Sequence, residues 1–258
     1  MSQPLFENLT EISNRLRTAS HVFLFLDFDG TLTPIVEQPD KAQLPPETKD
    51  ILTRLSRQNK ISVAIISGRA LVDVQARVGI DHLIYAGNHG LEISGPGIHF
   101  IHRQALARQE ALQQLSAQLA VKLRHLTGVE VEQKGLTTSI HYRRAAAAEV
   151  DEVVKTIQAL GVEVSSLFRL TTGKMIYEIR PRVDWHKGAA AYWIRAQLGY
   201  PNPLSIYLGD DATDENAFVA LQQDITVKVG PAYVTTARYH LADPDEVRKF
   251  LRYLTLEG

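Results

Sequence analysis

The chain of 258 residues is longer than an average domain and fits a core domain that carries a smaller second one. Hydrophobic residues make up 45% and charged residues 22%, which excludes a disordered or low-complexity chain. The net charge of −1 argues against bulk binding of nucleic acid, and the absence of cysteine excludes disulfides, thiol catalysis and cysteine-ligated zinc. Since neither a secretory signal nor a membrane-length apolar run is present, we expect a cytoplasmic protein with no membrane partner.

The first ninety residues alternate helical and strand patterns, which predicts a parallel sheet with helices on both faces. The expected elements are, in chain order, a helix with Leu5, Leu9, Ile12 and Leu16 on one face, a strand at 22–26, a helix opened by Pro45-Pro46, a strand at 61–66, a short helix at 71–78 and a strand at 83–85.

After Gly90 the pattern changes to paired strands and two long helices, which predicts an antiparallel α+β insertion over residues 103–181. We expect a hairpin turn at 95–97, one helix at 104–126, strands at 129–133 and 137–142, a helix at 145–160, and strands at 162–164, 168–171 and 175–180. The first pattern then resumes, so residues 1–102 and 182–258 form one core. Its last elements are expected as a helix at 187–198, a strand at 205–208, a helix at 213–221, a strand at 225–229 and a helix at 244–254.

The motif Asp27-Phe28-Asp29-Gly30-Thr31 places two carboxylates where the apolar strand 22–26 ends. The first carboxylate can attack phosphorus in line, and the second, beyond a turn, can handle the proton of the leaving oxygen. Gly30 would allow the turn, and the Thr31 hydroxyl can bind phosphate. A polar turn without catalytic function is the alternative, because Asp, Gly and Thr all favour turns. The motif favours phosphoryl transfer.

Two further segments fit a phosphate site. Ser67-Gly68-Arg69 follows the strand 61–66, at the sheet edge where ligands of open parallel sheets bind. Lys187-Gly188 begins a helix, where the lysine charge and the helix field would both favour a phosphoryl group. Taken singly, the first is more often a plain loop and the second a solvated helix end.

The segment from Gly209 to Glu215 is the strongest second signal. Asp210, Asp211 and Asp214 follow the strand 205–208 and would crowd the edge that carries Asp27 and Asp29. Like charges a few Å apart repel strongly unless a cation intervenes, and hard oxygen ligands favour Mg²⁺. Capping of the following helix by Thr213 is an additional, structural reading.

These segments occur in an order that resembles the haloacid-dehalogenase-like phosphatases. Three longer matches resemble the trehalose-6-phosphate phosphatases within them, over about residues 20 to 250. The matching segments are Ala86-Gly87-Asn88-His89-Gly90-Leu91-Glu92, Tyr177-Glu178-Ile179-Arg180-Pro181 with Asp184-Trp185-His186-Lys187-Gly188, and Gly209-Asp210-Asp211-Ala212-Thr213-Asp214-Glu215. The resemblance implies an α/β fold, with a Rossmann-like core and an inserted α+β cap that sets substrate choice.

The resemblance also implies roles for individual residues. Asp27 would be the nucleophile, Asp29 the general acid/base and a backbone metal ligand, and Lys187 a phosphate-binding catalytic group. Asp210 would complete the Mg²⁺ ligands, with Asp211 and Asp214 supporting it. The substrate-binding residues would be Thr31, Ser67, Gly68, Arg69 and His89 in the core and Glu132, Lys134, Arg143, Lys174 and Glu178 in the cap. From the residues alone, Glu132 with Lys134 could be a solvated strand face, and Lys174 with Glu178 a plain ion pair.

We therefore expect a Mg²⁺-dependent phosphatase of trehalose 6-phosphate that works through an aspartyl-phosphate. A phosphatase of another glycosyl phosphate, of the glucosylglycerol-, mannosyl- or sucrose-phosphate type, or a phosphosugar mutase is the nearest alternative. A phospho-accepting receiver-like signalling protein is the alternative from another class. The length, the insertion and Asp29 with Gly30-Thr31 disfavour it. The sequence leaves the oligomeric state open.

Overall fold

A computed structural model describes residues 2–36, 39–163, 166–173 and 175–257. The chain divides into two compact units, with Met1–Phe100 and Trp185–Gly258 in unit 1 and Ile101–Asp184 in unit 2. None of the described helices has the length and apolar character that a bilayer crossing requires.

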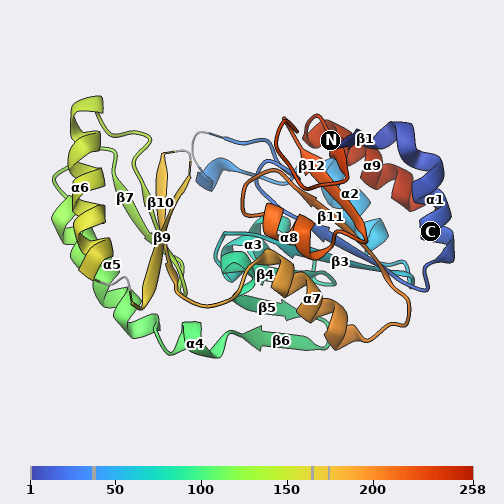
Figure 1. Cartoon of the computed structure of the whole chain (residues 1–258), viewed down its shortest axis with the longest axis horizontal. Helices are drawn as coiled ribbons and strands as arrows, with labels where there is room; N and C mark the ends of the chain where they lie inside the picture. The colour runs from blue at the N-terminus through green and yellow to red at the C-terminus, as the bar shows by residue number, and fades with distance from the viewer. Residues whose placement is uncertain (1, 37–38, 164–165, 174, 258) are drawn as a thin grey trace. The chain divides into compact units, whose positions relative to one another are not determined.

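Unit 1 is built on a mostly parallel nine-stranded sheet (Figure 1) in the order β1-β13-β12-β11-β2-β3-β4-β5-β6. The strands are β1 (Gln3–Pro4), β2 (Val22–Leu26), β3 (Ile61–Ile66), β4 (Ile84–Gly87), β5 (Glu92–Gly95), β6 (Ile98–Ile101), β11 (Leu204–Gly209), β12 (Ile225–Val229) and β13 (Tyr239–Leu241). The helices are α1 (Leu9–Thr18), α2 (Pro46–Leu55), α3 (Leu71–Val78), α7 (Lys187–Leu198), α8 (Glu215–Ala220) and α9 (Pro244–Glu257), with 3₁₀ turns at Leu5–Asn8, Pro39–Lys41 and Asn88–Gly90.

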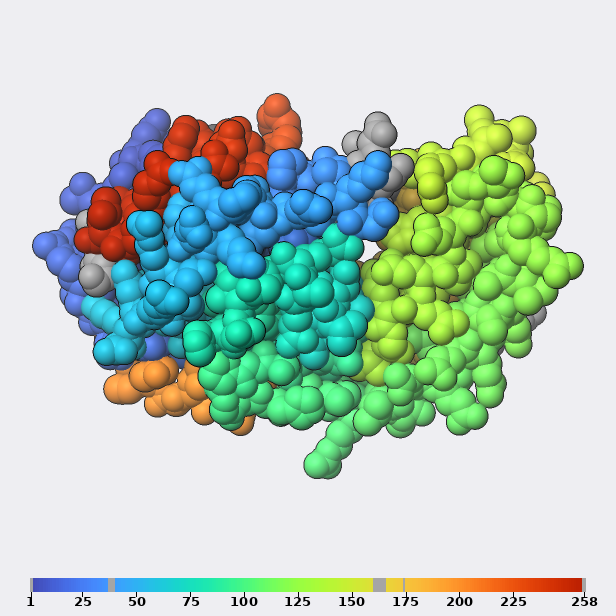
Figure 2. Space-filling model, turned by 180° about the vertical axis from the view of Figure 1, so that it is seen from behind, coloured from blue at the N-terminus to red at the C-terminus, as the bar shows by residue number. Residues whose placement is uncertain are grey.

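Both faces of this sheet are buried, because the side chains of β2 alternate between two cores. Leu24 and Leu26 pack with residues of α1, α2, α3 and α9, whereas Phe23 and Phe25 pack with residues of α7 and α8. Figure 2 shows α2 beside α9 on the outside of unit 1, where Arg248 Nε lies 3.0 Å from Glu47 Oε2. The predicted parallel sheet with helices on both faces is confirmed.

Unit 2 is an antiparallel four-stranded sheet in the order β7-β8-β10-β9, with two long helices along one face (Figure 1). Its elements are α4 (Arg103–Leu106), α5 (Gln109–Leu123), β7 (Glu130–Gln133), β8 (Thr138–His141), α6 (Ala147–Glu163), β9 (Phe168–Gly173) and β10 (Ile176–Pro181). Leucines of α5 pack on Ile140 of β8 and on Tyr177 and Ile179 of β10, so the helices cover the apolar face of the sheet.

Two local predictions are wrong. The single helix at 104–126 is two helices, because Arg108 leaves the helical conformation and its Nη1 donates to Arg182 O over 2.6 Å. The expected strand at 162–164 is wrong at 162 and 163, which continue α6 through Gly161, while 164 lies outside the described residues. One glycine costs a helix only about 1 kcal/mol, too little to end it.

Candidate active site

The centre of the site is an ion pair between strand β2 and helix α7. Lys187 Nζ donates to Asp27 Oδ1 and to Asp214 Oδ1, each over 2.8 Å. The lysine and both aspartates are almost fully buried. Asp27 follows directly after β2, and its amide donates to Leu208 O on the neighbouring β11, which fixes the backbone from which the carboxylate projects. The structure therefore places the Lys187 ammonium between the carboxylates of Asp27 and Asp214, at the end of β2.

Asp214 is held from two further directions. Tyr207 Oη donates to its Oδ1 over 2.8 Å, and the amide of Asp211 donates to its Oδ2 over 3.1 Å. Both oxygens of this buried carboxylate therefore accept hydrogen bonds, which fits a supporting role. Asp214 is also the N-cap residue of α8, and not Thr213, which instead donates through its amide and hydroxyl to Asp211 Oδ1.

Carboxylate oxygens of Asp27, Asp210 and Asp214 lie within 4.8 Å of one another. Burial raises the pKa of Asp27 well above its ordinary value, and Asp214 and Asp210 raise it further against the opposing charge of Lys187. Burial likewise raises the pKa of Asp210 to about 7, with Asp211 and Asp214 adding to the rise. Burial disfavours the Lys187 ammonium, yet Asp214 and Asp27 outweigh it and raise its pKa well above the ordinary value. The cluster therefore holds more negative charge than one lysine neutralises.

This donor set fits a hard divalent cation. Three carboxylates converge, and a cation among them would allow Asp27 and Asp210 to stay ionised at neutral pH. The predicted metal ligands were Asp27, Asp29 and Asp210. Among the converging side chains Asp214 takes the place of Asp29, whose side chain is paired with Arg69. The resemblance implied only a backbone role for Asp29 at the metal.

Gly30 and Thr31 close the loop after Asp27. Gly30 has φ 77°, and a Cβ there would lie 2.0 Å from Asp210 Oδ2, so only glycine permits this approach of the two acidic loops. The Thr31 hydroxyl is fully buried and has no hydrogen-bond partner among the described residues, which leaves it available to a phosphate oxygen.

Ser67, Gly68 and His89 come together at the ends of β3 and β4. Ser67 O accepts from the amide of His89 over 2.8 Å, and Ser67 Oγ accepts from the amide of Arg69 over 3.2 Å. A Cβ at Gly68 would lie 2.7 Å from Cε1 of the His89 ring, which therefore rests directly on this glycine. Asn88 and His89 both have positive φ, so the backbone is strained where it carries the histidine.

Residues that the sequence analysis missed support the same edge. Tyr207 lies inside an apolar strand, and no local pattern marks it as a partner of Asp214. The Lys228 ammonium on β12 is nearly buried and donates to the main-chain carbonyls of Asp210 and Val229. A lysine inside the strand 225–229, which otherwise carries no charge, was the signal for this second buried cation.

In unit 2, three of the predicted sugar-binding residues share the polar face of the sheet. Glu132 and Glu178 are both paired in register with Ser139, so these three side chains form one row across β7, β8 and β10. Glu178 is buried and accepts from Lys134 Nζ over 3.2 Å and from Arg180 Nε over 2.5 Å. Arg180 was missed, although it lies two residues after Glu178 and therefore on the same face.

Of the two other predicted cap residues, the structure describes only Arg143. Arg143 is exposed in the turn after β8, and Lys174 lies outside the described residues. Glu132 Oε2 pairs with His141 Nε2 over 2.9 Å, which adds a histidine to the polar face. The Ser139 hydroxyl is buried and has no hydrogen-bond partner among the described residues. The face therefore carries donors and acceptors of the kinds that sugar hydroxyls need.

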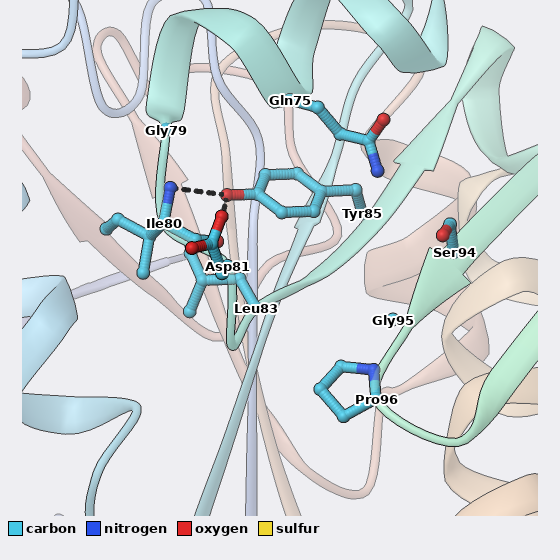
Figure 3. A pocket seen from close by; sticks show the side chains of 9 residues that line it. All are labelled: Gln75, Gly79, Ile80, Asp81, Leu83, Tyr85, Ser94, Gly95 and Pro96. Atoms are coloured by element: carbon cyan, nitrogen blue, oxygen red, sulfur yellow. Dashed lines mark hydrogen bonds between the residues drawn. The ribbon is translucent and has the colours of Figure 1, made fainter.

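A separate pocket of about 430 Å³ lies at the start of β4 in unit 1 (Figure 3). Its wall includes Gly79, Pro96 and Tyr85, whose hydroxyl bonds both the amide and the carbonyl of Ile80. It opens near the C-terminal end of α3, whereas Arg69 precedes the N-terminal end of this helix. No predicted site residue lines it, so this pocket is not the candidate active site.

Comparison with known proteins finds trehalose-phosphatases among family models, curated sequences and solved structures. The sequence model of the trehalose-phosphatase family matches residues 25–245. A trehalose-phosphate phosphatase of Mycobacterium tuberculosis is 41% identical over 226 residues, which cover 86% of this chain and 55% of that protein. An uncharacterized glycosyl hydrolase of the same species is 42% identical over 214 residues, covering 81% of this chain and 16% of that protein. The chain therefore spans about half of one curated relative and a sixth of the other.

Solved structures agree with the sequence comparison. The crystal structure of a trehalose-6-phosphate phosphatase related protein superposes with a TM-score of 0.80 at 25% identity, covering 91% of this chain and 97% of that one. The C-terminal domain of a Candida albicans trehalose-6-phosphate phosphatase has the same fold, with a TM-score of 0.80 at 24% identity, 99% coverage of this chain and 98% of that one. A haloacid dehalogenase-like hydrolase of Bacteroides thetaiotaomicron also shares the fold, with a TM-score of 0.63 at 14% identity, covering 91% of this chain and 99% of that one. The predicted fold class is confirmed.

Proposed function

Because the chain belongs to the trehalose-phosphatase family, we propose that it hydrolyses trehalose 6-phosphate to trehalose and inorganic phosphate. The observation that carries the proposal is the buried Asp27–Lys187–Asp214 group at the end of β2, with Asp29 two residues beyond the first carboxylate. Burying charged side chains costs folding free energy, so a buried group of this kind indicates a functional site. Its carboxylates and lysine suit attack on phosphorus.

In this proposal Asp27 attacks phosphorus, and the bond from phosphorus to the sugar oxygen breaks. Asp29 gives its proton to that oxygen, so trehalose leaves and an aspartyl-phosphate remains. Asp29 then takes a proton from a water molecule that attacks the same phosphorus, and the bond from Asp27 to phosphorus breaks. Lys187, whose Nζ lies 2.8 Å from Asp27 Oδ1, offsets negative charge during both steps. The hydroxyls of Thr31 and Ser67 donate hydrogen bonds to the phosphate oxygens.

We propose Mg²⁺ as the cation of the acidic cluster. Asp27 and Asp210 would hold it through carboxylate oxygens and Asp29 through its main-chain carbonyl, with Asp211 and Asp214 supporting these ligands. When bound, the ion neutralises charge that develops on the phosphoryl oxygens. The fit rests on the three converging carboxylates and the raised pKa values of Asp27 and Asp210.

The polar face of unit 2 supports the sugar part of the proposal. Glu178, Lys134 and Glu132 offer acceptors and donors on one sheet face, and we propose that they bind sugar hydroxyls together with Arg143, Lys174 and His89. Binding energy from such remote groups orients the phosphate, so it should appear in kcat/KM for the sugar substrate only.

Glu178→Ala should lower kcat/KM for trehalose 6-phosphate about 30- to 1,000-fold, corresponding to about 2–4 kcal/mol for loss of a buried charged hydrogen-bond partner. Hydrolysis of a small aryl phosphate, which needs only unit 1, should be spared. Glu178→Gln keeps the shape and serves as the milder variant. Glu152→Ala, which removes an exposed carboxylate bonded to His125 over 2.8 Å, is the control in the same unit.

Phosphate release from a panel of sugar phosphates decides the substrate. Trehalose 6-phosphate should be turned over well above glucosylglycerol-, mannosyl- and sucrose-phosphate substrates. Preference for one of these others would make that glycosyl phosphate the proposed substrate. If Glu178→Ala lowers kcat/KM equally for trehalose 6-phosphate and for the aryl phosphate, Glu178 supports the fold and not sugar binding.

A further inference from the structure

Arg69 forms a bidentate salt bridge with the side chain of Asp29. Arg69 Nε donates to Asp29 Oδ2 and Nη2 donates to Asp29 Oδ1, each over 2.7 Å. Such a two-point pair fixes both the position and the plane of a carboxylate. The arginine side chain is only 11% exposed while the aspartate side chain is 42% exposed, so a buried group holds one that faces outward.

The Arg69 guanidinium is also bound by a second carboxylate, that of Asp73. Arg69 Nη1 donates to Asp73 Oδ2 over 2.9 Å, and Arg77 Nε donates to both oxygens of Asp73 over 2.8 Å. Arg77 Nη1 in turn donates to the main-chain carbonyls of Asp40 and Ala42 over 2.9 and 2.8 Å. A chain of charged contacts thus runs from Asp29 through the first two turns of α3 to the segment that follows the nucleophile loop.

We propose that Arg69 is a positioning residue that aims the Asp29 carboxyl at the departing oxygen, with Asp73 and Arg77 holding the guanidinium in place. This inference rests on the proposed function, in which Asp29 protonates that oxygen. It differs from the phosphate-binding role that the sequence resemblance implied for Arg69. Three nitrogen atoms of the guanidinium already donate to carboxylates, and the group lies over the Phe28 ring, 5.4 Å from its centroid. Binding phosphate directly would require it to give up part of this fixed geometry.

The two roles predict different dependences on the leaving group. A misaimed acid slows the departure of a basic oxygen, whereas a nitrophenolate leaves without a proton. A lost phosphate ligand would slow both kinds of ester alike, because every substrate carries the same phosphoryl group. The kinetic constant to compare is kcat/KM, which covers only the steps up to release of the alcohol.

The experiment measures kcat/KM of the parent, Arg69→Gln, Arg69→Lys and Asp73→Asn on phenyl phosphate and on 2,4-dinitrophenyl phosphate. For phenyl phosphate we expect a loss of about 100-fold in Arg69→Gln and about 10-fold in Asp73→Asn, the range that misplacement of a general acid produces. For the dinitrophenyl ester each loss should stay within about threefold, since that step needs no acid. Arg69→Lys keeps the charge without the two-point grip and should resemble Arg69→Gln. Asp245→Asn is the control, because it breaks an Asp–Arg pair of 3.0 Å in α9, remote in sequence from the site.

Competitive inhibition by inorganic phosphate provides a second readout, and its inhibition constant should not change in Asp73→Asn. Equal losses on both esters, or a raised inhibition constant for phosphate in all three variants, would overturn the inference in favour of a phosphate ligand. A lower melting temperature with unchanged kinetics on both esters would overturn it in favour of a structural salt bridge. A parent that releases no phosphate from trehalose 6-phosphate would refute the proposed function and this inference with it, whereas an active parent whose variants lose both ester activities equally refutes this inference alone.

Discussion

Replacing Asp27 by Asn is expected to abolish phosphate release, with a loss of at least about 10³-fold, because an amide has the shape of the carboxylate but is not a useful nucleophile at phosphorus. The amide oxygen can still accept the hydrogen bond from Lys187, now 2.8 Å from Asp27 Oδ1. Steady-state phosphate release from the purified variant measures the effect. Activity within tenfold of the parent would contradict a covalent role for Asp27.

The same variant should unfold at a higher temperature than the parent when no metal is present. Burial raises the pKa of Asp27, so its ionised form costs folding free energy that a neutral amide avoids. Asp224→Asn is the matched control, since Asp224 is a buried carboxylate that accepts from Arg195 Nη1 over 2.9 Å and from the Ser205 amide over 3.0 Å. It should lower the melting temperature and leave turnover nearly intact. The opposite pattern would mean that Asp27 stabilises the fold.

Removal of divalent metal is the second change expected to have a large effect. Chelation should silence phosphate release, added Mg²⁺ should restore it, and Ca²⁺ should restore it poorly because its larger coordination shell misplaces the reacting groups. Full activity after exhaustive chelation and dialysis would contradict a metal-dependent site.

The metal-free protein should also lose stability as pH rises. Burial, with the charges of Asp211 and Asp214, raises the pKa of Asp210 from 3.8 to about 7. An acid whose pKa is raised by folding stabilises the folded state fully below the unfolded pKa and loses that contribution as pH rises through the folded pKa. The melting temperature without metal should therefore fall between about pH 4 and pH 7 on account of Asp210, and saturating Mg²⁺ should remove this fall. A flat profile without metal would show that folding does not raise the pKa of Asp210.

The central strands and the charged residues at their ends could be predicted from the sequence. Residues 22–26, 61–66 and 225–229 form strands with the predicted limits, because strands buried on both faces are rich in apolar residues, here interrupted only by Ser62, Thr226 and Lys228. Topology then brings Asp27, Ser67 and Asp210 to one edge, since parallel strands end together there. Lys187 begins helix α7, and the structure adds the contact of its ammonium with Asp27 Oδ1.

What could not be predicted depends on tertiary contacts between distant residues. The short strands β1 and β13 carry little local pattern and exist by pairing with each other and with β12. The break between α4 and α5 has no glycine or proline to mark it. Arg69 matched a phosphate-binding motif, and only the fold shows that Asp29 and Asp73 surround its guanidinium. Likewise the register of β8 with β10 decides which cap residues share a face with Glu178.

Trapping of a phosphorylated enzyme would show whether Asp27 forms a covalent bond to phosphorus. The protein would be mixed with trehalose 6-phosphate and Mg²⁺, quenched in acid within one turnover, reduced with borohydride and digested for peptide mass spectrometry. We expect residue 27 to be recovered as homoserine, the product of a reduced aspartyl-phosphate, in the parent and not in Asp27→Asn. Rapid release of phosphate with Asp27 unmodified, or modification at another residue, would contradict this expectation.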